Sequence, residues 1–293
     1  MALSPWYSRR IMRFDANRCL TAAFQACRLA GTIHREHFRQ DDLAVERKAD
    51  TSPVTRADRE SEAAIREVLR RATPELGVLG EEYGQEGDAR DRWIVDPLDG
   101  TKNFVAGIPY CATLIGLEID GALVLGICHA ALLGPGPPAR GSDPARQGET
   151  WWAVRGQGAF HGMGTEHATM RRRRPLRVRE EGDLSRAFLS HGGLAHFQAA
   201  GLWPALGELA ARAGRTRGFG DWWGHMLVAE GRCDAMIDPV VAYHDVAAVR
   251  VIVEEAGGVF RTRGAVPLGA DFRDAAVSVS AALAGSLQDI LGF

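Results

Sequence analysis

The stretch that decides the fold is Trp93-Ile-Val-Asp-Pro-Leu-Asp-Gly-Thr-Lys-Asn-Phe104. Its first three residues are apolar and predict a buried strand, which ends where two aspartates follow. Asp96 and Asp99 cannot face the same way on a straight strand, because side chains alternate between its two faces. Pro97 predicts the end of the strand and Gly100 permits a tight turn, so the chain can fold both carboxylates around one point.

Two carboxylates that converge on one point repel each other unless a cation lies between them. Their hard oxygen atoms favour Mg²⁺ over zinc or copper. Just beyond the turn, Gly100 and Thr101 offer backbone N–H groups and a hydroxyl, which suit a phosphate oxygen if Thr101 opens a helical turn. The alternative is an ordinary turn whose aspartates accept hydrogen bonds from backbone amides, and the spacing alone does not exclude it.

Two further acidic positions follow or precede apolar segments elsewhere in the chain. The run Val78-Leu79-Gly80 leads directly to Glu81, and Asp245 stands where an N-cap belongs, before a helix over residues 246–256 that ends at a Gly-Gly pair. The alternatives are a solvated pair of glutamates and a simple cap worth about 1 kcal/mol. The apolar surroundings of both positions favour a site shared with Asp96.

The rest of the pattern alternates strands with helices and predicts a layered α/β fold. The first half shows an amphipathic helix, a capping box that opens a second helix, a hairpin and a further strand, at residues 15–38, 55–58, 111–128 and 150–154. The second half shows strands at 187–190, 235–237 and 276–280, and helices at 202–212, 222–231 and 283–291.

The boundary between the halves is expected in residues 161–174, which show no periodicity. We expect an N-terminal α+β half over residues 1–165 that carries most metal ligands. A C-terminal α/β half over residues 175–293 would carry the last metal ligand and the residues that select the substrate. Residues 134–148 are rich in Gly and Pro and predict a surface loop.

The bulk composition limits the partners and the compartment. Over 293 residues the net charge is −2, and the five cysteines are scattered and never spaced as Cys-x-x-Cys. This indicates reduced thiols rather than a disulfide framework or a cysteine zinc site. Because Met1–Phe14 lacks an apolar signal core and no stretch approaches the roughly 20 apolar residues of a membrane span, we expect a cytoplasmic protein with no membrane partner.

Four consecutive arginines, Arg171–Arg174, leave a nucleic-acid-binding function open. They have no interleaved aromatic residues and belong to no recognisable binding motif, so we expect a solvated loop and no nucleic-acid partner. Weak binding with a steep salt dependence, lost when these charges are neutralised, would mark the alternative.

The acidic positions together suit the hydrolysis of a phosphate monoester. This reaction is so slow unaided that a catalyst must supply on the order of 20 kcal/mol. Two metal ions about 4 Å apart can activate water and neutralise the leaving oxygen. Such a pair needs several carboxylates and a base near the water, which Glu81, Asp96, Asp99 and Asp245 would provide.

Four motifs, in order along nearly the whole chain, resemble those of the inositol monophosphatase family of Mg²⁺-dependent, lithium-sensitive phosphatases. They are Ser52-Pro-Val-Thr-Arg-Ala-Asp58, Gly80-Glu-Glu82, the stretch Trp93–Phe104, and His244-Asp-Val-Ala-Ala248 leading to Glu255-Ala-Gly-Gly258. The resemblance implies the αβαβα sandwich that the family shares with fructose-1,6-bisphosphatase. It also implies a homodimer that binds two or three Mg²⁺ ions in each active site.

The resemblance further implies which residues hold the metals. The first metal would be held by Glu81, Asp96 and the carbonyl of Leu98. The second would be held by Asp96, Asp99 and Asp245.

Other implied roles concern water, phosphate and a third ion. Glu81 with Thr101 would orient and deprotonate the attacking water, and the backbone of Gly100 and Thr101 would bind phosphate. Asp58 matches a residue near a weaker third metal, and Lys48 matches a basic residue at the same opening.

One position departs from the family pattern, because His244 stands where tryptophan usually precedes the last metal ligand. The change removes no ligand. It could alter packing behind the site or add a titratable group. His244 as a metal ligand is the minor alternative, since the carboxylates already suffice.

The segment Arg217–Gly231, followed by Asp238, resembles the histidinol-phosphate phosphatase branch of the family. Histidinol phosphate carries an ammonium group that Asp221 and Asp238 could bind, and an imidazole on which Trp222 or the next tryptophan could pack. The alternatives are core tryptophans and a helix cap at Asp221. Asp238 matches an acidic contact to a substrate hydroxyl and would serve either kind of substrate.

Three functions therefore remain open from the sequence. The favoured one is Mg²⁺-dependent hydrolysis of L-histidinol phosphate in histidine biosynthesis. A second is hydrolysis of inositol 1-phosphate or of a broader set of sugar and nucleotide phosphates. The third is an inactive regulator that binds metal or phosphate, against which the intact Glu81 and Thr101 argue.

Overall fold

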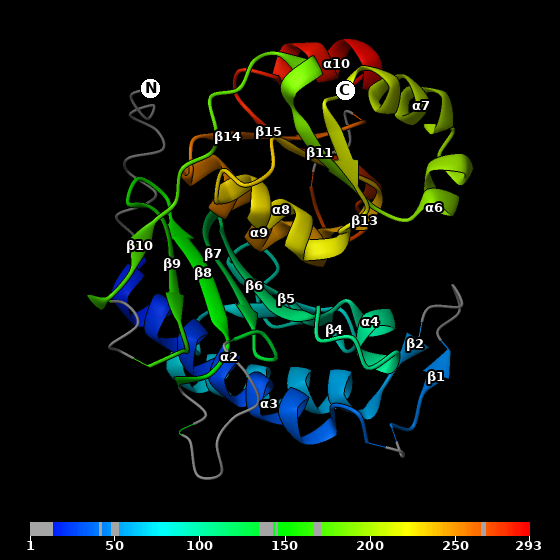
Figure 1. The fold of residues 1–293 in the computed structure, drawn as a ribbon. Coiled ribbons are helices and arrows are strands. Elements are labelled where there is room, and N and C mark those ends of the chain that lie inside the picture. The colour runs from blue at the N-terminus through cyan, green and yellow to red at the C-terminus, as the bar shows by residue number, and fades with distance from the viewer. Residues whose placement is uncertain are drawn as a thin grey trace.

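The computed structural model describes residues 14–40, 43–47, 53–134, 143, 146–166, 171–264 and 268–293. Its elements form five layers in the order helix, sheet, helix, sheet, helix, which Figure 1 shows from bottom to top. The predicted αβαβα sandwich is confirmed. In the described part of the chain, no helix is long and apolar enough to cross a membrane.

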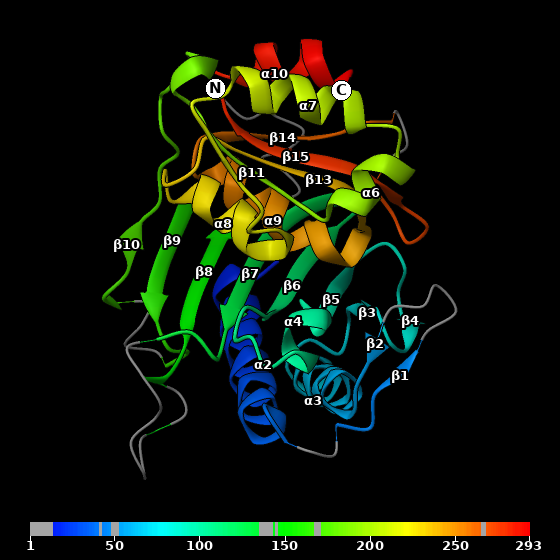
Figure 2. The same ribbon diagram turned by 45° about the vertical axis from the view of Figure 1, so that its right-hand side comes forward.

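The first layer is a pair of helices, α2 (Ala16–His37) and α3 (Arg56–Ala72), which pack on each other and on the first sheet (Figure 2). The side chains that α2 buries include four alanines and two cysteines, so the helix can approach the sheet closely. The predicted capping box opens α3, because the carboxylate of Asp58 accepts a hydrogen bond from the N–H of Thr55 at 2.8 Å.

The first sheet has eight strands in the order β10-β9-β8-β7-β6-β5-β3-β4. All neighbours are antiparallel except β3 and β5. The strands are β3 (Gly77–Gly80), β4 (Gly84–Glu86), β5 (Arg92–Asp99), β6 (Ala112–Ile119), β7 (Ala122–Ala130), β8 (Glu149–Val154), β9 (Gly158–Met163) and β10 (Arg174–Pro175). A separate two-stranded ribbon pairs β1 (Glu46–Arg47) with β2 (Pro53–Val54), and the short helix α4 (Thr101–Val105) follows β5.

The middle layer consists of α8 (Asp221–Ala229) and α9 (Tyr243–Glu255), which lie between the two sheets in both views (Figures 1 and 2). The second sheet has the order β12-β11-β13-β15-β14 and is covered outside by three helices. These elements are β11 (Phe188–His191), α6 (Leu194–Ala199), α7 (Trp203–Arg212), β12 (Arg215–Arg217), β13 (Ala235–Ala242), β14 (Gly258–Thr262), β15 (Arg273–Ser280) and α10 (Ala284–Leu291).

Two glycines let α9 lie directly on the first sheet. A Cβ atom at Gly126 of β7 would lie 2.3 Å from the carbonyl oxygen of Ala248, and one at Gly116 of β6 would lie 3.0 Å from the Cβ of Ala247. Real side chains do not tolerate the first distance, so glycine is required for this contact. The close approach holds α9 against the sheet that carries Asp96. It thereby positions Asp245, which lies in the first turn of α9.

Several sequence expectations need correction. β5 does not end at Pro97 but continues to Asp99, with an irregular register between Asp96 and Asp99. Asp245 is not the N-cap of α9, because the helix begins two residues earlier and Asp245 lies in its first turn. Residues 161–174, where the boundary between the halves is expected, include the end of β9 at residue 163 and the start of β10 at residue 174.

The halves of the chain correspond to the two sheets only approximately. Strands of the eight-stranded sheet lie within residues 77–175, and strands of the five-stranded sheet lie within residues 188–280. The division at residue 165 stays a prediction. Most of the predicted loop at 134–148, like Lys48, lies outside the described residues.

Candidate active site

The irregular segment of β5 directs the two aspartates of the central motif. Proline cannot donate to a strand ladder, and Pro97 lies where the register between β5 and β6 shifts. Its carbonyl accepts hydrogen bonds from the Nε2 of His34 at 3.0 Å and from the hydroxyl of Thr113 at 3.1 Å. These hydrogen bonds from two buried side chains fix the irregular backbone at Pro97. They thereby fix the directions in which the side chains of Asp96 and Asp99 point.

Glu81 reaches the same place from the neighbouring strand. β3 and β5 are parallel with Gly80 opposite Val95, so Glu81 and Asp96 leave adjacent strands at their carboxyl ends. The N–H of Glu81 donates to the carbonyl of Val95 at 3.1 Å. Parallel neighbours of this kind bring successive loops together, which is a common position for a site.

A buried glutamate that the sequence reasoning missed fixes the turn after Glu81. The carboxylate of Glu62 accepts from the N–H of Glu82 at 2.6 Å and from the N–H of Tyr83 at 3.1 Å, and it pairs with Arg66 at 2.8 Å. A Cβ atom at Gly80 would lie 2.0 Å from this carboxylate, so only glycine fits there. The signal in the sequence is weak, since Glu62 is one of several charged residues on α3.

Thr101 opens α4, after Gly100 adopts a left-handed conformation with φ of +89°. This meets the condition under which the N–H groups of the turn suit a phosphate oxygen. The hydroxyl of Thr101 lies 2.9 Å from both Asp58 Oδ1 and the carbonyl of Leu98, and it can donate to either. The other oxygen of Asp58 accepts from the N–H of Thr55 at 2.8 Å and from its hydroxyl at 2.6 Å. Both carboxylate oxygens of Asp58 are therefore engaged, and burial raises its pKa.

Asp245 approaches Asp96 from the middle layer. Its Oδ2 accepts from the N–H of Ala242 at 2.7 Å, which turns the carboxylate back toward the start of α9. The neighbouring His244 points its Nε2 to within 3.3 Å of Asp245 Oδ1 and 3.8 Å of Glu81 Oε1. We call Glu81, Asp96, Asp99 and Asp245 the carboxylate cluster.

Burial and the charges of neighbouring carboxylates raise the pKa values of the aspartates in the cluster. Burial, and then the charge of Glu81, raises the pKa of Asp96 well above its usual range. Burial, and then the charge of Asp221, does the same to the pKa of Asp99. Burial also raises the pKa of Asp245, although His244 acts in the opposite direction.

This donor set fits a hard divalent cation. Carboxylate and carbonyl oxygens are the ligands that such ions prefer, and Leu98 lies between Asp96 and Asp99 in the chain. One ligand atom from each of Glu81, Asp96 and His244 lies within 4.8 Å of the other two. A cation would also offset the repulsion that raises the pKa of the aspartates.

A cavity of about 220 Å³ adjoins the cluster. The predicted substrate residues Asp221 and Asp238 lie in its wall with Asp99 and Asp245, as does Trp222. Lining residues that the sequence reasoning did not identify are Lys102, Gly193, His196, His225, Val240 and Val241. Lys102 and His225 lie within stretches already singled out in the sequence, whereas no motif marks the other four positions. The six come from separate elements that only the fold brings together.

Of the two predicted substrate aspartates, Asp238 is buried, and Asp221 is half-buried and hydrogen-bonded to the central motif. The Nδ2 of Asn103 donates to Asp221 Oδ2 at 3.1 Å, and burial raises the pKa of Asp221. Burial, and then the charge of Asp221, raises the pKa of Asp238 to about 8. A Cβ atom at Gly192 would lie 2.7 Å from Asp238 Oδ1, so the chain leaves room for this carboxylate.

Trp222 serves mainly as a packing residue. Its side chain belongs to the core, with the residue 1% exposed, and its ring lies against Trp151 at a centroid distance of 5.5 Å. The backbone N–H of Trp222 donates to Asp99 Oδ2 at 3.1 Å, which links the start of α8 to the carboxylate cluster. The alternative reading of the tryptophan pair as core therefore describes Trp222, while Trp223 is half-buried and contacts Tyr110.

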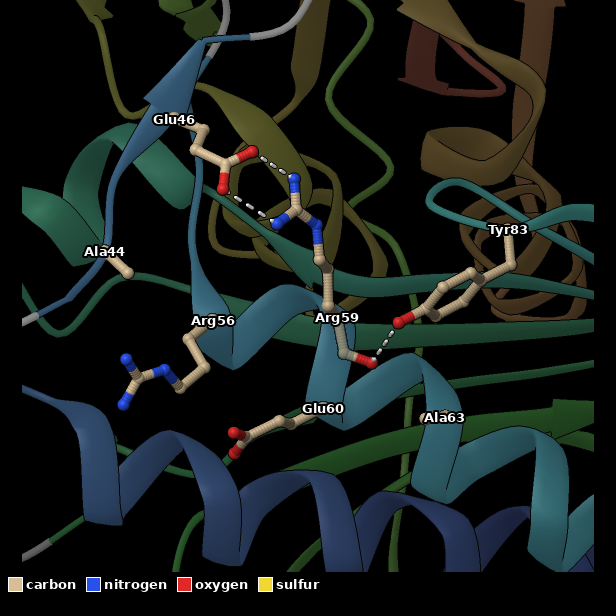
Figure 3. A pocket seen from close by; sticks show the side chains of 7 residues that line it. All are labelled: Ala44, Glu46, Arg56, Arg59, Glu60, Ala63 and Tyr83. Carbon is tan, nitrogen blue, oxygen red and sulfur yellow. Dashed lines mark hydrogen bonds and ion pairs between the residues drawn. The ribbon is translucent and has the colours of Figure 1, made fainter.

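A second cavity, of about 370 Å³, lies on the outside of α3 (Figure 3). Arg59 reaches across it to pair with Glu46 at 2.5 Å. Its lining residues are Ala44, Glu46, Arg56, Arg59, Glu60, Ala63 and Tyr83. None of these belongs to the carboxylate cluster, so we place the chemistry at the smaller cavity.

Known proteins resemble this chain in sequence and in fold. The model of the inositol monophosphatase family matches residues 15–289. The chain is 38% identical over 235 residues to a histidinol-phosphatase of Streptomyces coelicolor, covering 79% of this chain and 80% of the relative. It is 40% identical over 232 residues to a histidinol-phosphatase of Mycobacterium tuberculosis, covering 78% and 81%.

Two further matches carry a different name. The chain is 35% identical over 247 residues to an inositol-1-monophosphatase of Rhizobium meliloti, covering 82% of this chain and 83% of the relative. The structure of an inositol monophosphatase from Zymomonas mobilis superposes with a TM-score of 0.76 at 28% identity, covering 96% of this chain and 100% of that one. Fold, site and matches together define a phosphoric monoester hydrolase for small phosphate esters. The chain belongs to the inositol monophosphatase family.

The crowded carboxylates give a first prediction about stability. The folded pKa of Asp96 is raised, so without metal the folded state keeps a proton that the unfolded chain releases near pH 4. The contribution of Asp96 to stability without metal is therefore fully present below about pH 4 and is lost as the pH rises from there through the raised pKa of the folded state. Asp96→Asn removes this charge, and in EDTA at pH 8 we expect its melting temperature to rise by roughly 2–6 °C.

Differential scanning fluorimetry in EDTA and in Mg²⁺ measures the effect. Asp96→Asn should also lose most of the stabilisation that Mg²⁺ gives the wild-type protein. Asp183→Asn is the matched control, since Asp183 is exposed and caps a turn away from the cluster. A lower melting temperature of Asp96→Asn in EDTA, with the control unchanged, would contradict the repulsion argument.

Proposed function

We propose that this phosphatase hydrolyses L-histidinol phosphate to L-histidinol and phosphate, as a step of histidine biosynthesis, and that it depends on Mg²⁺. The observation that carries the proposal is the position of two aspartates, the half-buried Asp221 and the buried Asp238, in the cavity that adjoins the carboxylate cluster. A phosphate at the cluster would leave the rest of a small ester in contact with them. The two relatives named histidinol-phosphatase support the same substrate.

The cluster would divide its ligands between two ions. Glu81, Asp96 and the Leu98 carbonyl would hold the first, and Asp96 would share the second with Asp99 and Asp245. When bound, the ions would polarise the phosphoryl group, lower the pKa of the attacking water and neutralise the leaving oxygen. A third ion beside Asp58 stays a prediction.

The side chains would then position the reactants. The hydroxyl of Thr101 donates toward Asp58 or Leu98, so its lone pairs are left to accept a hydrogen bond from the attacking water. Glu81 would accept the proton that this water loses. The N–H groups of Gly100 and Thr101 would hold the phosphate while the ester bond breaks.

The ammonium group of histidinol phosphate explains why two aspartates with raised pKa are useful. Each is costly to ionise alone in the cavity, because burial and its neighbour disfavour the charged form. A bound ammonium would favour the charged form of both and form charge-assisted hydrogen bonds with them. Inositol 1-phosphate brings no such cation, so it would leave the charged forms of both aspartates disfavoured. It remains the second candidate because a relative carries that name.

Three further properties belong to the proposal. We infer a homodimer, sensitivity to lithium and a cytoplasmic location, all of which the family resemblance or the composition suggests. Two of the four consecutive arginines have partners within the protein, since Arg174 pairs with Glu230 at 3.1 Å and Arg173 lies over the ring of Phe160.

Metal dependence and the general base are tested together. We expect phosphate release from histidinol phosphate in Mg²⁺, none in excess EDTA, and recovery when Mg²⁺ is restored. Glu81→Gln should lower kcat by about three orders of magnitude, because it removes a metal ligand and the base at once. Glu180→Gln, an exposed residue outside the site, is the control. Full activity in EDTA would overturn the metal role, and near-normal turnover by Glu81→Gln would overturn the role of that residue.

Substrate recognition is tested by removing one charge. Asp221→Asn keeps an oxygen that can accept from Asn103 but loses the charge that would meet the ammonium. We expect KM for histidinol phosphate to rise about 10- to 100-fold, since a hydrogen bond to a charged group is worth about 1.5–3 kcal/mol. KM for inositol 1-phosphate and for an uncharged alcohol phosphate should change little. An equal effect on all three substrates would remove the ammonium argument.

A further inference from the structure

His244 is placed to act on the metal site directly. It lies in the first turn of α9, between the buried Tyr243 and the cluster residue Asp245. Its side chain is 21% exposed, and its Nε2 faces two carboxylates, at 3.3 Å from Asp245 Oδ1 and 3.8 Å from Glu81 Oε1. The imidazole therefore lies at the edge of the cluster.

The spacing of His244 fits a shared ion. Ligand atoms bound to one octahedral ion at about 2.1–2.2 Å are about 3 Å apart when adjacent and about 4.3 Å apart when opposite. One ligand atom each from Glu81, Asp96 and His244 lies within 4.8 Å of the other two. Three side chains from a strand end, a strand and a helix thus surround a single point.

The elements that carry these ligands are fixed independently of any metal. Glu81 follows a turn that the buried Glu62 holds through two backbone N–H groups. Asp96 lies on the neighbouring parallel strand. His244 is held by α9, which packs on the sheet at Gly116 and Gly126. Rigid supports of this kind favour a preformed site over a chance contact.

We propose that His244 Nε2 is a ligand of the ion bound by Glu81 and Asp96, and that this nitrogen shifts the site's preference from Mg²⁺ toward Mn²⁺. The inference rests on the proposed metal dependence. Imidazole nitrogen binds first-row transition metals well, whereas Mg²⁺ favours oxygen ligands. A site with one nitrogen and several carboxylate oxygens therefore discriminates between the two ions by ligand type.

The competing account is a hydrogen bond from His244 to Asp245. It would orient that carboxylate but place no nitrogen on the ion. Under it, loss of His244 would weaken Mg²⁺ and Mn²⁺ equally. The two accounts therefore differ in a spectroscopic signature and in the ratio of two affinities.

The test uses the full chain loaded with Mn²⁺ in the absence of substrate. Electron spin echo envelope modulation reports ¹⁴N nuclei bound to Mn²⁺, and we expect a nitrogen coupling in the wild-type protein that is lost in His244→Phe. His161→Phe is the matched control, because His161 pairs with Glu149 on the far strands of the sheet and should leave the coupling intact.

Affinities measured by calorimetry complete the test. His244→Phe should weaken Mn²⁺ binding about tenfold or more and Mg²⁺ binding less than about threefold. His244→Gln, whose amide can still donate to Asp245, should behave like His244→Phe, and it replaces that variant if the larger ring prevents folding. No nitrogen coupling in the wild-type protein, or equal losses of both ions, would overturn the proposal. Metal-dependent hydrolysis that persists alongside such a result would leave the proposed function standing.

Discussion

The repulsion among one buried and three half-buried carboxylates is the constraint on which the rest of the structure depends. Glu81, Asp96, Asp99 and Asp245 come from β3, β5 and α9, and burial raises the pKa of all three aspartates. Isolated buried charges are costly, so the fold must hold them together by other contacts. Glycines under α9 supply one such contact, and hydrogen bonds to the Pro97 carbonyl supply another.

An Asp-Pro pair interrupts a strand on each side of the site. In β5 the register shifts after Asp96, and in β13 it shifts after Asp238. Proline has no N–H to offer its neighbour, so each strand leaves the ladder where its aspartate must turn toward the ligand. One aspartate would serve the metals and the other the substrate. The same Asp-Pro irregularity thus occurs in both sheets, once at the carboxylate cluster and once at the adjoining cavity.

The sequence predicted the elements with strong local signals and missed what depends on long-range packing. The capping box at Thr55 and the hairpin turn at Gly121 were correct, because their chemistry is local. The end of β5 at Pro97 was wrong, since side chains from α2 and β6 stabilise a continued strand. Glu62 and His196 carry no motif, and only the fold shows that one holds the Glu81 turn and the other lines the cavity.

Anomalous diffraction from crystals soaked in Mn²⁺ tests the central claim most directly, because it locates the ions without relying on activity. The account predicts strong peaks between Glu81 and Asp96 and between Asp96, Asp99 and Asp245, and no peak of similar height at the cavity beside Arg59. Peaks only outside the carboxylate cluster, or four acidic side chains that turn away from a common centre, would contradict it.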